Sequence, residues 1–353
     1  MMVKEKYHNV EFLRFIFAII IVYFHILHGN IMKFIGNNHD YVVLAQLSNK
    51  AGYIVECFFL ISGYFLYKNI ENSNNVEIVK FIWKKIVRLW PVLAFSLIID
   101  LLFFRLNVYT AIFNLLFLQC IGLSLDYKGI NWYVSPLFWT LIFYYSLFKN
   151  FDKKKTYVVL GGISYFAYLT NISYCNGGFT RETVWGIVNL GLTNALANIG
   201  LGIFIGKILT ITENVKIQLN DKLINLVISL IEITCILFLV KYFLLGLSYK
   251  NAFIVVIVFS ILFVCFIKKR GFISRLVNIK IFSELGKYAY SIYVMQQISF
   301  NILQITLWKT SIINNTVICI IISLLCSVLL GIITYHIIEK PSYKYLIYGN
   351  VIK

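Results

Sequence analysis

The stretch EFLRFIFAIIIVYFHILH, residues 11–28, decides the fold class. It is apolar over a length that can cross a bilayer, which takes about 20 mainly apolar residues. Two ionisable side chains, Arg14 and His25, lie within this run. The run is too long for a signal peptide and no small-residue cleavage site follows it. We therefore expect it to remain in the protein as a membrane span.

The composition extends this expectation to the whole chain. Apolar residues make up 60% of the 353 residues and charged residues only 13%, against about 25% charged in ordinary soluble domains. The formal net charge is +17, but the charges lie between long apolar runs. A nucleic-acid-binding protein carries its basic residues on a hydrophilic face instead. The sequence thus predicts an all-α polytopic membrane protein and excludes a soluble or disordered chain and a nucleic-acid partner.

Ten segments are predicted to span the membrane. They are residues 12–28, 52–67, 86–104, 132–148, 156–171, 187–209, 223–245, 251–267, 288–308 and 316–338. An eleventh apolar stretch, 111–124, is shorter, and we interpret it as an interfacial or re-entrant segment. No linker separates soluble domains, so residues 1–353 are expected to form a single membrane-embedded domain. Scattered cysteines without CxxC spacing predict neither a disulfide framework nor a metal site.

The distribution of Lys and Arg predicts the orientation. With the N-terminus inside and ten spans, all but eight of the 32 Lys and Arg lie on or next to the cytoplasmic side, as the positive-inside rule requires. The eight exceptions are Lys33, Lys50, Arg105, Lys128, Arg181, Lys241, Lys250 and Lys309. Both termini are therefore predicted to be cytoplasmic. Abundant Ile, Asn, Lys and Tyr are typical of a low-GC bacterial genome, which favours a bacterial plasma membrane.

Ionisable groups within a span are costly, and by default they indicate functional sites. Arg14 and His25 are eleven residues apart, about three helical turns and about 16 Å, so they share one helix face. Glu56, in the second span, lies at a depth similar to that of His25. A carboxylate beside a histidine can fix its tautomer and raise its basicity. The structural alternative is an arginine that snorkels to the interface and a histidine bonded to a neighbouring carbonyl.

The third span opens with WKKIVRLWP, residues 83–91. Lys85 and Arg88 are three residues apart and share a helix face. They are either positive-inside anchors or a site for phosphate groups, which Arg and Lys bind well. Among the remaining acids, Asp100 is placed to pair with Arg105, whereas the sequence offers no explanation for Glu232. The GxxxG at 202–206 is typical of helix packing.

In chain order, these elements resemble the acyltransferase-3 family of membrane acyltransferases, many of which O-acetylate cell-surface glycans. Arg14 and His25 fit the family's Arg-x10-His pattern. VECFFLISGYF, residues 55–65, is similar to its acidic-x-Phe-Phe-x-x-Ser-Gly-Phe stretch, with Glu56 in the acidic place. KIVR, residues 85–88, resembles its Arg-x-x-Arg element, with Lys85 in the first Arg place.

Three later segments extend the resemblance to nearly the whole chain. They are NWYV at 131–134, LGKYAYSIYVMQQ at 285–297 and IIEKPSY at 337–343. Two departures stand out. The segment WTLIFYYSLF, residues 139–148, lacks the Glu that many members have there, and Gln296 replaces the late family His.

The resemblance implies transfer of an acyl group, expected to be acetyl from acetyl-CoA, to a hydroxyl of a cell-surface or cell-envelope carbohydrate. His25 would deprotonate the acceptor hydroxyl or carry the acetyl group itself, and Glu56 would orient the imidazole. Ser62 would help to position the thioester. The CoA phosphates would meet three basic side chains, Arg14, Lys85 and Arg88.

Two other functions fit the same pattern of spans and buried charge. One is a transporter or flippase for a glycan or lipid-linked intermediate, which would move its substrate without acetyl-CoA. The other is an accessory subunit of a glycan-assembly complex, which would act only together with partner proteins. An enzyme is instead expected to release CoA in a reaction that depends on His25.

Overall fold

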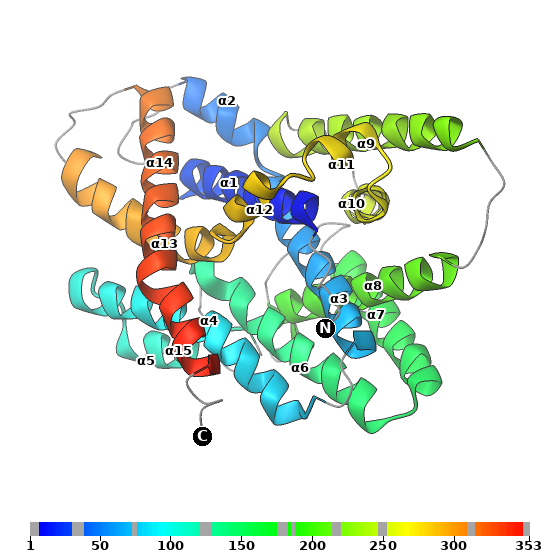
Figure 1. Ribbon diagram of the computed structural model, residues 1–353. Helices are drawn as coiled ribbons and strands as arrows, with labels where there is room; N and C mark the ends of the chain where they lie inside the picture. The colour runs from blue at the N-terminus through cyan, green and yellow to red at the C-terminus, as the bar shows by residue number, and fades with distance from the viewer. Residues whose placement is uncertain are drawn as a thin grey trace. The chain divides into compact units, whose positions relative to one another are not determined.

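Figure 1 shows the computed structural model of the chain, which divides into two compact units. The structure describes residues 7–29, 39–72, 76–120, 129–174, 183–184, 188–213, 220–245, 253–308 and 315–348. The first unit comprises Met1–Ile54, Ile211–Ser248 and Ile254–Ile332, and the second comprises Val55–Thr210, Tyr249–Phe253 and Ile333–Lys353. Each unit is thus assembled from stretches that are far apart in the sequence.

The secondary-structure elements among the described residues of the first unit are all helices or helical turns. Its elements are α1 (His8–His28), α2 (His39–Leu47), the 3-10 turn η2 (Ala51–Tyr53), α9 (Asp221–Leu244), α10 (Phe253–Lys268), α11 (Phe272–Leu276), α12 (Lys280–Gly286), α13 (Ala289–Leu303), the π-helical turn η4 (Gln304–Trp308) and most of α14 (Thr316–Thr334).

The second unit is also helical, apart from one small strand pair. Its helices are α3 (Ile54–Asn72), α4 (Ile78–Phe103), α5 (Val108–Leu115), the 3-10 turn η3 (Ile130–Tyr133), α6 (Val134–Asn150), α7 (Lys153–Tyr174), α8 (Leu190–Glu213), the π-helical turn η5 (Tyr335–Glu339) and α15 (Lys340–Tyr348). The strands β1 (Thr183–Val184) and β2 (Val188–Asn189) are antiparallel, and Val184 pairs with Val188.

Every predicted span overlaps a helix, although residues 187 and 251–252 lie outside the described residues. Among the described residues, five helices are long and apolar enough to cross a membrane: His8–His28, Ile78–Phe103, Leu190–Thr212, Asp221–Leu244 and Val317–Leu346. A multi-pass membrane protein is therefore confirmed. The count of ten spans and the cytoplasmic termini stay predictions, as does the single domain.

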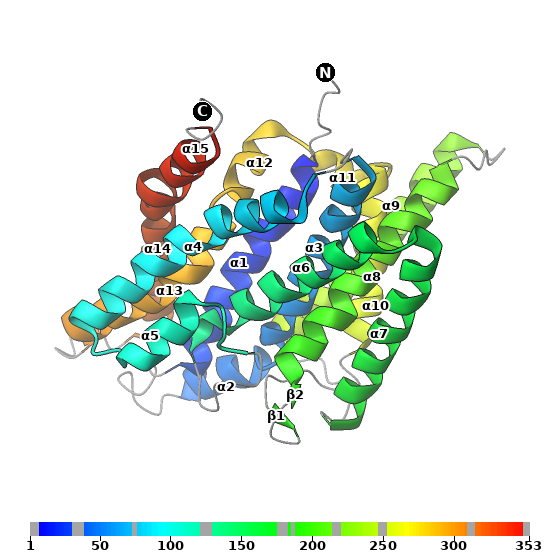
Figure 2. The same ribbon diagram turned by 90° about the horizontal axis from the view of Figure 1, so that it is seen from below.

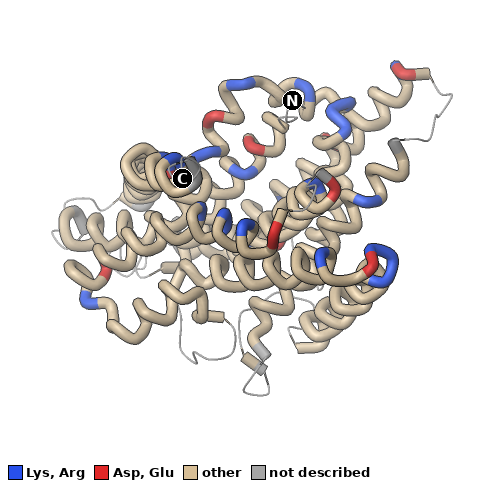
Figure 3. Tube along the Cα trace, turned by 60° about the horizontal axis from the view of Figure 1, so that its bottom comes forward, with Lys and Arg blue, Asp and Glu red and all other residues tan. Residues whose placement is uncertain are grey.

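The shorter apolar segment 111–124 is not one continuous helix. Within it, α5 ends at Leu115 and a turn follows to residue 120, whereas residues 121–124 lie outside the described residues. Five of the eight predicted external basic residues also lie outside them, namely Lys33, Lys128, Arg181, Lys250 and Lys309. Figure 3 marks the described Lys and Arg in blue, between long uncharged stretches of helix.

The first helix is fixed within its unit along one side and at its start. Its buried positions include Val10, Leu13 and Phe17, which recur at helical spacing. The helix packs against α12 and α13, and the ring of Phe17 meets that of Phe259 on α10. At its start, the Asn9 amide donates to the carbonyls of Phe266 (2.6 Å) and Ser274 (3.3 Å). The last carbonyls of a helix have no partner within it, so Asn9 ties α1 to the end of α10.

In the second unit, glycines bring helices close together. A Cβ at Gly202 of α8 would overlap the carbonyl oxygen of Leu60 and lie 2.8 Å from the Tyr64 nitrogen of α3. The neighbouring helices α7 and α8 run side by side (Figure 2), and the hydroxyl of Tyr168 on α7 donates to Asn198 on α8 (2.8 Å). The GxxxG motif therefore serves packing, as its sequence predicts.

Replacing Gly202 with alanine is expected to destabilise the protein by roughly 1–3 kcal/mol, because the new methyl group overpacks backbone atoms that cannot move aside. The matched control is Gly162→Ala in α7, where a Cβ would meet nothing within 4 Å. That substitution is expected to be neutral or stabilising by up to about 1 kcal/mol. The thermal midpoints of the purified proteins in detergent measure the difference, and equal midpoints for the two variants would contradict the packing argument.

Candidate functional site

His25 lies near the end of α1 and faces α13 of the same unit. Its Nδ1 atom is 3.0 Å from Oε1 of Gln296. His25 is half-buried, whereas Gln296 has no exposed surface. The sequence identifies both residues, but Gln296 only as a departure from the family pattern. Its place midway along the ninth predicted span was the signal that it needs a partner there.

The orientation of the Gln296 amide follows from its second hydrogen bond. Its Nε2 atom donates to the carbonyl oxygen of Tyr293, at 2.7 Å. A carbonyl only accepts, so the amide nitrogen must face Tyr293 and the amide oxygen must face His25. The oxygen in turn only accepts, which places the proton of a neutral His25 on Nδ1. The opposite ring nitrogen, Nε2, then carries the lone pair.

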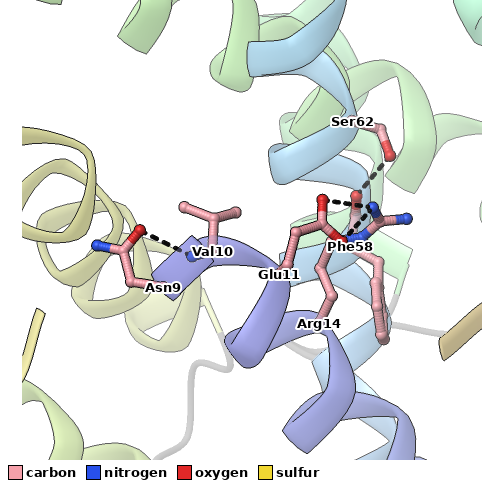
Figure 4. Close-up of polar contacts among 6 residues, drawn as sticks. All are labelled: Asn9, Val10, Glu11, Arg14, Phe58 and Ser62. Atoms are coloured by element: carbon pink, nitrogen blue, oxygen red, sulfur yellow. Dashed lines mark hydrogen bonds and ion pairs between the residues drawn. The ribbon is translucent and has the colours of Figure 1, made fainter. Parts of the chain in front are cut away.

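Arg14 forms an ion pair on its own helix. Its Nη1 atom lies 3.1 Å and 3.2 Å from the two carboxylate oxygens of Glu11, one turn earlier (Figure 4). Glu11 also packs against the end of α12, since a Cβ at Gly286 would meet the Glu11 Cβ at 2.6 Å. The sequence analysis did not predict a role for Glu11, although its i,i+3 spacing from Arg14 is typical of helix ion pairs.

Glu56 belongs to the second unit and is buried there, with 2% of its surface exposed. Its Oε2 accepts from Nδ2 of Asn198 (2.5 Å), which also donates to the Asn194 carbonyl (3.0 Å). The Tyr168 hydroxyl donates to Oδ1 of the same Asn198 amide. Asn198 and Tyr168 were not identified from the sequence. The contact of Glu56 with His25 stays a prediction, because His25 lies in the first unit.

Ser62 and the basic residues of α4 complete the predicted set. The Ser62 hydroxyl donates to the carbonyl of Phe58, one turn earlier, at 2.8 Å (Figure 4). Arg88 is exposed, and Lys85 is half-buried with its ammonium group 5.0 Å from the ring centre of Phe81. Lys85 and Arg88 lie in one helix at the predicted spacing. Their binding of phosphate stays a prediction.

Glu232, which the sequence left unexplained, supports a neighbouring helix. Its Oε2 accepts from the backbone N–H groups of Ile273 (3.0 Å) and Ser274 (3.2 Å) at the start of α11. These groups have no partner within the helix. Gly271 leaves room for this contact, since a Cβ there would overlap the Glu232 carboxyl group. The predicted pair of Asp100 with Arg105 stays a prediction.

These features define a helical, multi-pass membrane protein with a histidine and an amide paired inside one unit. Its sequence matches the family model Acyl_transf_3, an acyltransferase domain, over residues 7–336. The chain belongs to this acyltransferase-3 family, and it is a membrane acyltransferase. No curated protein and no solved structure matches it. The family assignment favours an enzyme over the transporter and accessory-subunit alternatives.

The role of Glu232 can be tested by substitution with alanine. We expect Glu232→Ala to lower the free energy of unfolding by roughly 1–3 kcal/mol, because it leaves buried N–H groups of α11 unsatisfied. Turnover per folded molecule should not change. Glu77→Ala is the control, since Glu77 is exposed beside Lys80 at 3.6 Å and its loss should change stability by less than about 0.5 kcal/mol. A Glu232 variant of normal stability but low turnover would place Glu232 in the reaction instead.

Proposed function

We propose that the protein transfers an acetyl group from acetyl-CoA to a hydroxyl of a cell-surface or cell-envelope carbohydrate, with His25 as the general base. The observation that carries this proposal is the hydrogen bond between His25 Nδ1 and Gln296 Oε1. A neutral ring bonded in this way carries its lone pair on Nε2, and the chain belongs to a family of acyltransferases. The bacterial plasma membrane is the proposed location, because acetyl-CoA is cytoplasmic while many envelope glycans face outward.

The reaction requires one proton to move twice. Nε2 of His25 accepts the proton of the acceptor hydroxyl while the oxygen attacks the thioester carbonyl. The bond from the carbonyl carbon to sulfur then breaks, and the thiolate of CoA takes the proton from the imidazolium. The products are an acetyl ester and free CoA. A positioned general base typically contributes about 10²–10⁴-fold to the rate.

The charged residues have proposed roles in binding the donor. Lys85 and Arg88 would bind phosphate groups of CoA, since the guanidinium group offers a planar pair of donors and the ammonium group a compact charge. Arg14 would also bind a phosphate, which would compete with the Glu11 carboxylate for the same donors. Ser62 would help to position the thioester. Orientation of the imidazole by Glu56 stays a prediction, since the contact to Nδ1 of His25 is made by Gln296. Glycan-assembly proteins are the proposed protein partners.

Replacing His25 with alanine is expected to lower glycan acetylation by about 10²–10⁴-fold, because the general base is lost. His28→Ala is the matched control. His28 lies one turn further along α1, is exposed, and has its Nδ1 3.0 Å from the Phe24 carbonyl of its own helix. Both variants are produced at equal membrane levels in a deletion strain, and acetate on the surface glycans is measured by mass spectrometry.

Near-normal acetylation by His25→Ala would remove His25 from the mechanism. A transporter would be indicated by a different outcome, in which the wild type moves a glycan across the membrane and releases no CoA from acetyl-CoA. An accessory subunit would show no transfer after purification, but would regain it when its partner proteins are added.

Arg88→Ala is expected to weaken CoA binding about five- to tenfold, which corresponds to roughly 1–1.4 kcal/mol. The loss is modest because Arg88 is exposed and water screens its charge. Lys80→Ala is the control, since Lys80 lies in the same helix and pairs with Glu77. Titration of the purified proteins with CoA gives the affinities. Equal affinities for wild type and Arg88→Ala would show that Lys85 and Arg88 do not bind CoA and serve only to orient the helix in the membrane.

A further inference from the structure

We propose that Gln296 is a positioning residue for His25: its amide oxygen holds the imidazole in the Nδ1–H tautomer, so that Nε2 faces the acceptor hydroxyl as the proton acceptor. This inference rests on the proposed function, because it assigns a task to the partner of the proposed base. Gln296 does not touch substrate in this scheme and acts only through His25.

The first support is the fixed orientation of the amide. Gln296 is bonded at both ends, with Oε1 3.0 Å from His25 Nδ1 and Nε2 2.7 Å from the Tyr293 carbonyl. Turning the amide over would bring its nitrogen towards His25 and its oxygen against the Tyr293 carbonyl oxygen, which has no proton to donate. The backbone carbonyl of Tyr293 on α13 therefore determines that the amide oxygen of Gln296 faces His25.

The second support is the burial and rigidity of the helix that carries Gln296. Gln296 is fully buried, and α13 packs against α1 in the same unit. On another side, α14 approaches α13 so closely that a Cβ at Gly331 would lie 2.7 Å from the Cα of Ile292, one turn before Gln296. A buried amide on a closely packed helix loses little additional freedom when it orients a neighbouring ring.

The third support is the contrast with Gln297. This neighbouring residue has the same side chain but points around the helix by about 100°. Its Nε2 atom donates to Oδ1 of Asn301 on α13 itself, at 3.0 Å. Only one of two adjacent glutamines therefore reaches the proposed base, and Gln297 provides a control of the same residue type on the same helix.

The first experiment measures the tautomer directly and does not depend on activity. The chain contains five histidines, so ¹⁵N-histidine NMR of the detergent-solubilised protein gives a small set of ring signals, and His25→Gln identifies those of His25. We expect a neutral Nδ1–H ring in the wild type and in Gln297→Leu. In Gln296→Leu, this signal should shift towards a mixture of tautomers.

The second experiment measures acetyl transfer from labelled acetyl-CoA to the glycan fraction of membranes. Gln296→Leu is expected to lower kcat about 10- to 100-fold, the loss seen when the hydrogen-bond partner of a metal-bound histidine is removed, while KM for acetyl-CoA changes less than about twofold. Gln296→Glu retains an acceptor oxygen for Nδ1, so it should keep the Nδ1–H tautomer, but its second oxygen would face the Tyr293 carbonyl and it should restore only part of kcat. Gln297→Leu should behave as wild type, and the double variant His25→Ala/Gln296→Leu should be no slower than His25→Ala alone.

The outcomes separate this inference from the proposed function. If His25→Ala is inactive while Gln296→Leu retains both its kcat and its Nδ1–H signal, the positioning role is wrong and the general base stands. If His25→Ala is active, the proposed base is wrong, whatever the tautomer. Where Gln296→Leu does not fold, Gln296→Glu still decides: a retained Nδ1–H signal supports the role, and loss of the Nδ1–H signal with unchanged kcat overturns it.

Discussion

The hydrocarbon core of a bilayer offers no water to polar side chains, so each polar group within a span must find its partner inside the protein. This constraint accounts for the three buried contacts that matter most here. The imidazole of His25 meets the Gln296 amide, the carboxyl group of Glu56 meets the Asn198 amide, and Glu232 accepts from the start of α11. Each contact joins helices that are distant in the sequence.

The same three contacts differ in what they leave available for chemistry. The Oε2 atom of Glu232 is engaged by two backbone N–H groups, and the arrangement supports a short helix. The carboxyl group of Glu56 is buried, with 2% of its surface exposed, and it accepts from the Asn198 amide, which in turn accepts from the Tyr168 hydroxyl. His25 alone of these three is half-buried, and Nδ1 is the ring nitrogen that bonds to Gln296. Partial exposure together with one oriented nitrogen is what a proton-transfer group requires.

The sequence could predict the helices and the family because both depend on local patterns. Apolar runs located the helices that overlap the ten predicted spans, but not α2, α11, α12 or α15. Ordered short motifs located the acyltransferase-3 resemblance that the family match confirms. The partners were harder to predict, since Gln296 is 271 residues from His25 and Asn198 is 142 residues from Glu56. A single sequence specifies which polar groups need partners, but the pairing of helices decides which partner each obtains. Glu232 shows this most clearly, because its role depends on a turn after α10.

The choice of an amide beside His25 has a physical consequence of its own. A carboxylate in that place would also accept the Nδ1 proton, but it would bring a second charge into a region where unpaired charge is costly. A neutral amide fixes the ring orientation without that cost, and it stabilises the imidazolium form less. Because the imidazolium must return its proton to the leaving thiolate, a partner that binds it only moderately favours the second proton transfer as well as the first. An amide is therefore suited to a histidine that accepts a proton and releases it again within one turnover.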